Sequence, residues 1–140
     1  MRAKTVLLTV GRLVRRKGVD KTIAALALLP PDVLANLVYV IAGTGPEENY
    51  LKKLVPPLLR DRVCFQGEIS EEEKWKWLKA CDIFIMPARH IAGDFEGFGI
   101  VYLEANICSK PVIAGQSGGV SDAVEDGRNG LLVDPDDPAA

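Results

Sequence analysis

Short apolar runs rich in valine and isoleucine alternate along the chain with segments whose apolar residues recur every three or four positions. We interpret the runs as buried strands, because strands covered on both faces of a parallel sheet are continuously apolar. Six strands are expected, at residues 5–10, 37–42, 62–65, 82–86, 111–114 and 131–133. The alternation predicts an α/β fold with a doubly wound, Rossmann-like parallel sheet of six strands.

The segments between the runs carry helix signals. Val19, Ile23 and Leu26 share one helical face, and Ser70 followed three residues later by Glu73 has the pattern of a capping box. A helix is predicted at 100–108 and a short one at 120–124. The apolar stripe that starts at Leu51 should be interrupted or ended by the prolines at 56 and 57.

Size and composition narrow the functional classes. A chain of 140 residues with 48% hydrophobic residues suits one domain, and a net charge of −2 argues against a nucleic-acid partner. No apolar run approaches the roughly 20 residues of a membrane-spanning helix. Three cysteines without a CxxC spacing favour a reducing, cytoplasmic setting, and no metal-binding set is recognisable. We therefore expect no metal and no cofactor.

The end of the sequence has the pattern of a helix start, with aspartates at 136 and 137 followed by Pro138. The sequence stops two residues later. We therefore expect residues 1–140 to be one domain excised from a longer chain, with a natural tail that frays as the alternative.

The strongest chemical signal is a pair of carboxylates, Glu96 and Glu104, around the turn Gly97-Phe98-Gly99. The helical neighbours of Glu104 are apolar, so its carboxylate needs a partner. That partner is either a basic side chain elsewhere in the fold or the hydroxyls of a ligand such as a ribose. Eight residues of helix span about 12 Å, which would place the two carboxylates in one cleft.

A basic loop, Gly11 to Gly18, follows the first expected strand. Ligands of open α/β sheets lie beyond the carboxyl ends of the strands, where Arg12 could bind phosphate oxygens and Lys17 could add a point charge. A solvated basic loop is the alternative. The order Lys17-Gly18 does not match a Walker A loop.

Further loops follow the second, third and fifth strands. The Gly43-Thr-Gly45 segment lacks the third glycine of a dinucleotide fingerprint, so Gly45 is expected at most to line the cleft. The segment 66–69 could bind a base edge, and the glycine-rich segment 115–119 could approach a phosphate or sugar; both could also be plain turns. His90 lies in a loop, where a lone histidine is usually just exposed.

Six ordered blocks carry a family resemblance: GRLVRRKG, IAGTGPEE, VCFQGEIS, EGFGIVYLEA, KPVIAG and SGGVSDAVEDGRNGLLVDP. Together they resemble the carboxy-terminal domain of the family-4 retaining glycosyltransferases, one half of a GT-B fold. The resemblance covers almost the whole chain and implies that residues 1–140 are the nucleotide-sugar-binding domain of a longer, two-domain chain. It implies transfer of a hexose from a nucleotide sugar to an acceptor with retention of configuration.

The resemblance also implies roles for individual residues. Arg12 and Lys17 would bind the donor diphosphate and offset the charge of the leaving group, while Glu96 would contact the transferred sugar. Glu104 would hold the ribose. The other donor-binding residues that the resemblance implies are Glu68, Ile69, Gly97, Phe98 and Gly99. Gly11 and Gly45, from the loops described above, complete the expected donor-binding set.

Two departures from the family pattern bear on these expectations. Ser109 stands where the family usually has glycine, which should affect only a helix end. The segment from Met86 to Glu96 is longer than the common short form, which resembles the branch of lipid-directed mannosyltransferases and points to GDP-mannose, with a UDP-sugar as the alternative donor. The longer loop leaves the roles of His90 and Asp94 open.

The remaining expectations concern partners and rivals. The acceptor site should belong to an absent amino-terminal domain. Only that domain would contact a membrane, and it would do so at the membrane's inner face. The isolated domain should therefore be inactive or nearly so. The rival interpretations are a GT-B enzyme of another class, such as a sugar-nucleotide epimerase or a phosphorylase, and a non-catalytic nucleotide-binding or interaction module.

Overall fold

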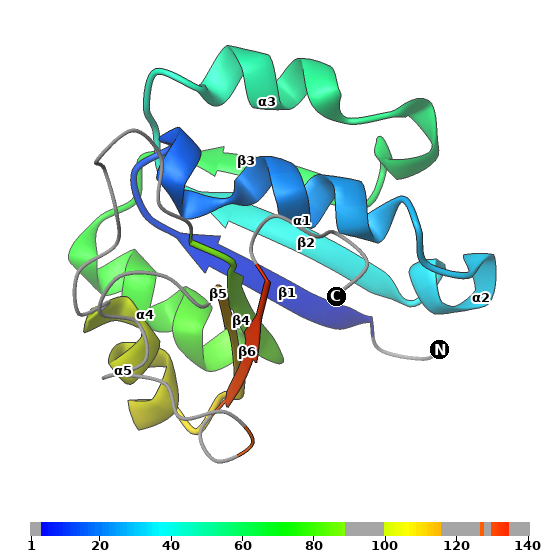
Figure 1. Ribbon diagram of the computed structural model, residues 1–140. Helices are drawn as coiled ribbons and strands as arrows, with labels where there is room; N and C mark the ends of the chain where they lie inside the picture. Colours follow the sequence, from blue (N-terminus) through cyan, green and yellow to red (C-terminus); the bar gives the residue numbers. More distant parts are fainter. Residues whose placement is uncertain (1–3, 89–99, 116–126, 128–129, 135–140) are drawn as a thin grey trace.

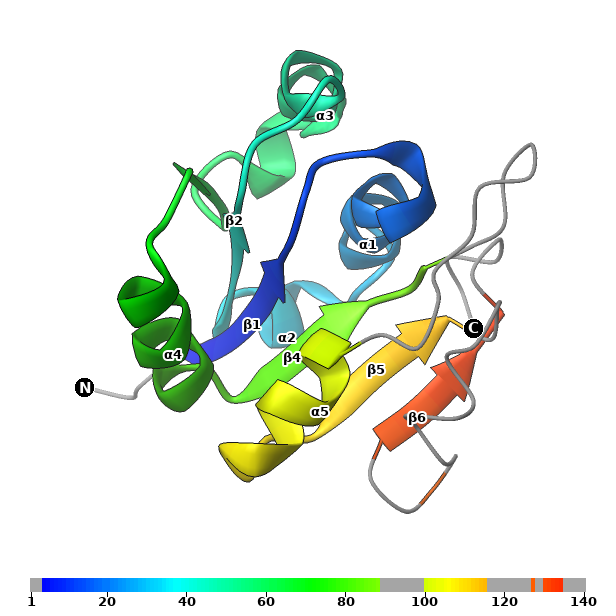
Figure 2. The same ribbon diagram turned by 90° about the vertical axis from the view of Figure 1, so that its left-hand side faces the viewer.

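A parallel sheet forms the centre of the molecule in the computed structural model, which describes residues 4–88, 100–115, 127 and 130–134. The described residues form six strands in the order β3-β2-β1-β4-β5-β6, and every neighbouring pair is parallel. Figure 2 shows the strand arrows pointing the same way. The strands are β1 (Thr5–Val10), β2 (Leu37–Ala42), β3 (Val63–Gly67), β4 (Ile83–Met86), β5 (Val112–Gly115) and β6 (Gly130–Val133).

Helices cover both faces of this sheet. The first three helices lie over one face and the last two over the other (Figure 1). Their bounds are α1 (Val19–Leu26), α2 (Pro31–Leu34), α3 (Glu48–Leu54), α4 (Glu71–Ala80) and α5 (Ile100–Ile107), with single 3₁₀ turns at η1 (Arg15–Lys17) and η2 (Pro57–Leu59). Within the described residues, no helix combines the length and apolarity needed to cross a bilayer.

The two faces of the sheet bury two separate cores. Leu7 and Tyr39 point toward α1, α2 and α3, whereas Leu8 and Val40, one position further along the same strands, pack with α4 and α5. Successive side chains of a strand alternate between faces. Burial on both faces is the reason that β1 and β2 are continuously apolar, and the predicted doubly wound α/β fold is confirmed.

Most predicted boundaries match within one or two residues. The strands β1 and β2 have the predicted bounds, and α3 ends at Leu54, before Pro56, as expected. The strand predicted at 62–65 instead spans 63–67, and the helix predicted at 100–108 ends at Ile107. The helix expected at 120–124 and the helix start at 136–138 lie outside the described residues.

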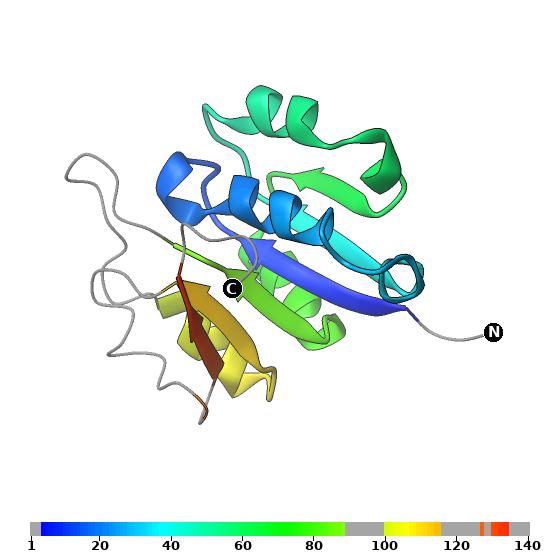
Figure 3. The same ribbon diagram turned by 45° about the vertical axis from the view of Figure 1, so that its right-hand side comes forward.

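The strand order reverses next to β1. The chain builds β1, β2 and β3 toward one edge and then returns to place β4 on the other side of β1 (Figure 3). In open α/β sheets, the loops at the carboxyl ends of the strands diverge at such a point and leave a crevice for a ligand. A ligand crevice is therefore expected among the loops that follow β1, β2 and β4.

Candidate functional site

The loops that leave β1, β2 and β3 are joined by their backbones. The Gly11 amide donates to the Ala42 carbonyl at 3.1 Å, and the Gly43 amide donates to the Gly67 carbonyl at 2.8 Å. Gly43 has a φ of +134°, and a Cβ added to it would lie 1.9 Å from the Gly11 carbonyl oxygen. A glycine is therefore required at position 43 for the two loops to approach this closely.

A small hollow lies where these loops meet the first turn of α4. It encloses about 200 Å³, less than the roughly 300–1,000 Å³ typical of small-molecule sites. Its lining comes from the ends of β1 and β2 and from the segment that enters α4: Val10, Gly11, Arg12, Ala42, Gly43, Glu68, Ile69, Ser70, Glu71 and Lys74. Four residues that the sequence predicts for the site, Gly11, Arg12, Glu68 and Ile69, therefore line one hollow at the edge where ligands of this fold bind.

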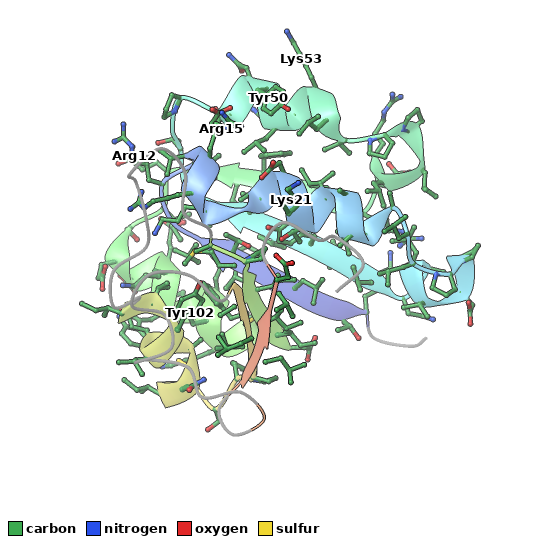
Figure 4. The ribbon with its side chains drawn as sticks, viewed as in Figure 1. Arg12, Arg15, Lys21, Tyr50, Lys53 and Tyr102 are labelled. Carbon is green, nitrogen blue, oxygen red and sulfur yellow. The ribbon has the colours of Figure 1, made fainter. Side chains whose placement is uncertain are left out.

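Arg12 and Lys17 both lie at the carboxyl end of β1, in different surroundings. Arg12 is exposed, lines the hollow and extends away from the sheet (Figure 4). Lys17 is buried, with 9% of its surface exposed. A Cβ added to Gly11 would lie 3.7 Å from Lys17 Cε and 4.0 Å from Met86 Sδ, at the end of β4. The Lys17 side chain therefore runs alongside Gly11. Both cations therefore lie near the point where the strand order reverses.

Glu68 and Ile69 lead into the amino terminus of α4. The predicted capping box is confirmed: Ser70 Oγ accepts from the Glu73 amide at 3.1 Å, and Glu73 Oε1 accepts from the Ser70 amide at 3.2 Å. The first turn of a helix carries a partial positive charge. Glu68 and Ser70 are exposed on the wall of the hollow, whereas Ile69 is half-buried against the core.

Glu104 forms an ion pair within the fold. Its Oε2 accepts a hydrogen bond from Lys74 Nζ at 2.7 Å, and its side chain is 17% exposed. The first of the two partners left open by the sequence, a basic side chain, is thus present. Glu104 does not itself line the hollow among the described residues, but its partner Lys74 does.

The environment inferred for Glu104 from its helical neighbours needs a correction. Ile100 is 67% exposed and Ile107 is 74% exposed, whereas Val101 and Cys108 pack against the core, so only half of the apolar neighbours are shielded. Contact with α4 through Lys74 provides the rest of the shielding of Glu104. The conclusion that Glu104 lies off the solvated face is right, but a contact between helices is part of its physical reason.

Gly45 packs against the protein backbone. A Cβ at this position would lie 2.5 Å from the Leu13 carbonyl oxygen, so the close approach of two loops already requires a glycine there. Among the described residues, the wall of the hollow contains Gly43 and not Gly45. The donor-binding role expected of Gly45 stays a prediction.

Part of the predicted site cannot be placed. Glu96, Gly97, Phe98 and Gly99 lie outside the described residues, as do His90, Asp94 and most of the glycine-rich segment 115–119. The spacing between Glu96 and Glu104 is therefore still a prediction from the sequence.

Six wall residues were not predicted as site residues from the sequence, and three of them are instructive: Gly43, Glu71 and Lys74. Gly43 was not predicted because the Gly43-Thr-Gly45 segment was judged only as an incomplete dinucleotide-binding fingerprint. Its position directly after a strand already indicates that it lies at the edge where ligands bind. Glu71 and Lys74 occupy the first turn of a helix whose entry segment, 66–69, had been singled out. Reading one helical turn further would have included them.

Burial and hydrogen bonding act in opposite directions on Lys74. Burial lowers the pKa of its ammonium, and the hydrogen bonds to Glu104 and Glu71 raise it by more, so the pKa lies above its usual value. The same ammonium lowers the pKa of Glu71. Lys74 and Glu71 therefore remain charged at neutral pH.

Hollows elsewhere on the described residues include two larger ones. One, of about 550 Å³, is formed by residues that include Ile83, Val112 and Gly130, the first residues of their strands. It therefore lies at the amino ends of the strands, away from the edge where ligands of this fold bind. The other, of about 300 Å³, lies between η1 and α3, and its wall includes Arg15 and Tyr50 (Figure 4).

The described residues contain no group of three or more histidine, cysteine, aspartate or glutamate side chains that could hold a metal ion.

The sequence profile of the family described as Glycosyl transferases group 1 matches residues 2–140. The chain belongs to this family.

Relatives of this group 1 glycosyl transferase domain include a GDP-mannose-dependent alpha-(1-6)-phosphatidylinositol monomannoside mannosyltransferase from Mycolicibacterium smegmatis. The two are 41% identical over 137 residues, which cover 96% of this chain and 36% of the relative. The chain thus spans about a third of the length of this relative.

Solved structures match the fold of the group 1 glycosyl transferase domain. Anabaena Alr3699/HepE, in complex with UDP and glucose, matches with a TM-score of 0.83 and 31% identity, covering 97% of this chain and 36% of that one. The C-terminal domain of a group 1 family glycosyl transferase from Francisella tularensis matches with a TM-score of 0.80 and 26% identity, covering 99% of this chain and 71% of that one. The six-stranded α/β fold is that of a carboxy-terminal GT-B domain.

Proposed function

We propose that this chain is the donor-binding domain of a retaining glycosyltransferase that moves a hexose from a nucleotide sugar to an acceptor. The observation that carries the proposal is the meeting of the basic loop after β1, the loop after β3 and Lys74, the ion-pair partner of Glu104, around one hollow at the carboxyl edge of the sheet. This is the edge at which α/β sheets bind nucleotides.

Each part of this edge suits one part of a sugar nucleotide. Arg12 supplies positive charge for a diphosphate, and Lys17 adds an ammonium near the ends of β1 and β4. Glu68 and Ile69 would face the base. Glu104 would accept the ribose hydroxyls, since a carboxylate has about four lone-pair sites and Lys74 uses one of them.

Catalysis would then depend on positioning and charge. We infer front-side attack by the acceptor with retention of configuration, in which no protein nucleophile takes part. Arg12 and Lys17 would stabilise the departing diphosphate, and Glu96 with the turn Gly97-Phe98-Gly99 would hold the sugar. No metal or other cofactor enters this mechanism.

The donor proposed is GDP-mannose, with a UDP-sugar as the second candidate. The mannosyltransferase relative from Mycolicibacterium smegmatis is named as GDP-mannose-dependent, and the Anabaena structure contains UDP and glucose. The acceptor site would belong to the part of the relatives' length that this chain does not span.

Calorimetric titration of the 140-residue chain with GDP, UDP and inorganic diphosphate tests the proposal. Arg12→Ala should weaken binding of all three by about 1–3 kcal/mol, because a charge-assisted contact to phosphate is lost. Glu104→Gln should weaken GDP and UDP binding and leave inorganic diphosphate unaffected.

Arg60→Ala is the matched control, because Arg60 is also an exposed arginine but precedes β3 at the opposite end of the sheet. It should leave every affinity unchanged. If the wild-type chain bound neither nucleotide at millimolar concentration, or if Arg12→Ala bound as tightly as Arg60→Ala, the proposed function would be refuted.

A further inference from the structure

Lys74 connects the two helices on one face of the sheet. Its Nζ lies 2.7 Å from Glu104 Oε2 on α5 and 2.8 Å from Glu71 Oε1 on its own helix, α4. The side chains of Lys74 and Glu104 are 16% and 17% exposed, whereas Glu71 is 72% exposed. The link between the helices is thus the shielded half of this arrangement, and the contact to Glu71 is its solvated half.

A shielded ion pair restricts its members more than a surface pair does. Exposed ion pairs are screened by water and contribute little, whereas a pair withdrawn from water interacts strongly and holds its geometry. Glu104 is attached by a charge-assisted hydrogen bond, a short and directional contact. Its carboxylate is therefore fixed in orientation before any ligand arrives.

The position of Lys74 adds a second observation. Lys74 forms part of the wall of the hollow, together with Gly11 and Arg12 from the loop after β1. In the described part of the chain, Glu104 Oε1 makes no hydrogen bond, while Oε2 is taken by Lys74. Lys74 thus contributes to the wall of the hollow and also binds the Glu104 carboxylate, of which only Oε2 is hydrogen-bonded among the described residues.

We propose that Lys74 is a positioning residue: it holds Glu104 by one oxygen, so that the other is directed at a ribose diol, and thereby sets the preference for ribonucleoside over 2′-deoxyribonucleoside diphosphates. The inference rests on the proposed function, since it assumes that Glu104 binds ribose. A fixed acceptor binds a diol more tightly than a mobile one, because less conformational freedom is lost on binding.

The readout is the ratio of the affinity for GDP to that for 2′-deoxy-GDP, measured by calorimetry on the 140-residue chain, with inorganic diphosphate as a third ligand. In the wild type we expect a ratio of about 10 or more, the size of one hydrogen bond to a charged group. In Lys74→Met the ratio should fall to about 2 or less, while the affinity for inorganic diphosphate changes less than about twofold. Lys74→Arg, which retains the charge, should restore part of the ratio.

Lys76→Met is the matched control. Lys76 lies on the same helix, is 73% exposed and pairs with Glu72 at 3.5 Å, so it has the same chemistry without the link to α5. Its ratio should equal that of the wild type. An unchanged ratio in Lys74→Met, or an equal loss of all three affinities, overturns the inference.

A double variant separates this inference from the proposed function and from a folding defect. If Lys74 acts through Glu104, adding Lys74→Met to Glu104→Gln should change the ratio no further. A further loss in the double variant overturns the positioning role. A wild-type chain that binds no nucleotide refutes the proposed function itself. If Glu104→Gln loses the preference for GDP over 2′-deoxy-GDP while Lys74→Met keeps it, only the role of Lys74 is refuted.

Discussion

At the scale of single residues, a short chain of side-chain hydrogen bonds crosses the sheet. Thr9 Oγ1 on β1 lies 2.6 Å from the hydroxyl of Tyr39 on β2 and donates to the Ile85 carbonyl on β4. A carbonyl can only accept, so the one hydroxyl hydrogen of Thr9 is used there and Tyr39 must be the donor to Thr9. Tyr39 is fully buried, and burial raises the pKa of its phenol well above the usual value.

Removing the Tyr39 hydroxyl should have a moderate cost with a pH signature. Tyr39→Phe should lower the free energy of unfolding by about 1 kcal/mol at pH 7, because one buried hydrogen bond is lost while Thr9 keeps its acceptor. The phenol ionises near pH 10 in the unfolded chain and higher in the folded one. The advantage of the wild type should therefore be complete below about pH 10 and decline above it.

Denaturant unfolding of both proteins at pH 7, 9 and 10.5 measures this difference. Tyr50→Phe serves as the control, because Tyr50 is 53% exposed and its hydroxyl is reached by water. A cost equal to that of Tyr50→Phe, or a difference that grows above pH 10, would contradict the hydrogen-bond direction assigned to Tyr39.

The candidate site shows where residue-level prediction succeeds and fails. Arg12 could be placed near the crevice because it lies two residues after the end of a strand, and strand ends are recognisable from apolar runs. The partner of Glu104 could not be found, because Lys74 is 30 positions away and only the packing of α4 beside α5 brings the two together. Spacing along one helix describes neighbours on that helix and contains no information on the next helix.

At the scale of elements, glycine explains three of the boundary errors. The strand β3 continues to Gly67, β5 continues to Gly115 and β6 begins at Gly130, although each glycine was left outside the predicted strand. Parallel pairing depends on backbone amides and carbonyls, so a glycine beside a paired strand can continue the ladder without a side chain. The apolar pattern records burial of side chains, and therefore misses residues that pair without one.

The end of α5 shows an element under local strain. The Lys110 amide donates to the Ala105 carbonyl and the Ser109 amide to the Asn106 carbonyl, the two hydrogen bonds of a Schellman motif. Ser109 occupies the left-handed position of this motif, with a φ of +61°. Glycine is the residue that adopts this conformation without steric cost, which explains the glycine usual here in the family that the sequence resembles.

Replacing Ser109 by glycine should therefore stabilise the domain. We expect Ser109→Gly to raise the free energy of unfolding by about 0.5–1 kcal/mol, since relief of the left-handed strain exceeds the added freedom of the unfolded chain. Ser109→Ala keeps the strain and should bring no gain. Thermal unfolding of the three proteins decides the matter, and a midpoint for Ser109→Gly at or below that of the wild type would show that position 109 carries no strain.

At the scale of the whole molecule, the site results from topology. The residues that meet at the hollow come from segments as far apart as Val10 and Lys74, and neither the hollow nor the Lys74–Glu104 link exists in any single element. The sequence predicted the fold because burial on two faces leaves a strong pattern. It predicted which loops converge because parallel strands end at one edge. It did not predict which side chains would contact one another there.

This arrangement also separates binding from transfer. The edge that we propose for the donor lies within a chain that spans 36% of a full-length relative, and positioning an acceptor against the donor accounts for much of the barrier reduction in a two-substrate enzyme. We therefore expect the 140-residue chain to bind GDP-mannose or a UDP-sugar while transfer to any acceptor stays at the background rate. Incubation with radiolabelled donor and a phosphatidylinositol mannoside, followed by extraction of lipid, measures transfer, and calorimetry on the same preparation measures binding. The mannosyltransferase from Mycolicibacterium smegmatis is the positive control. Labelled lipid formed at a rate within tenfold of that control would mean that the acceptor is held by this chain itself, and the division of labour inferred here would be wrong.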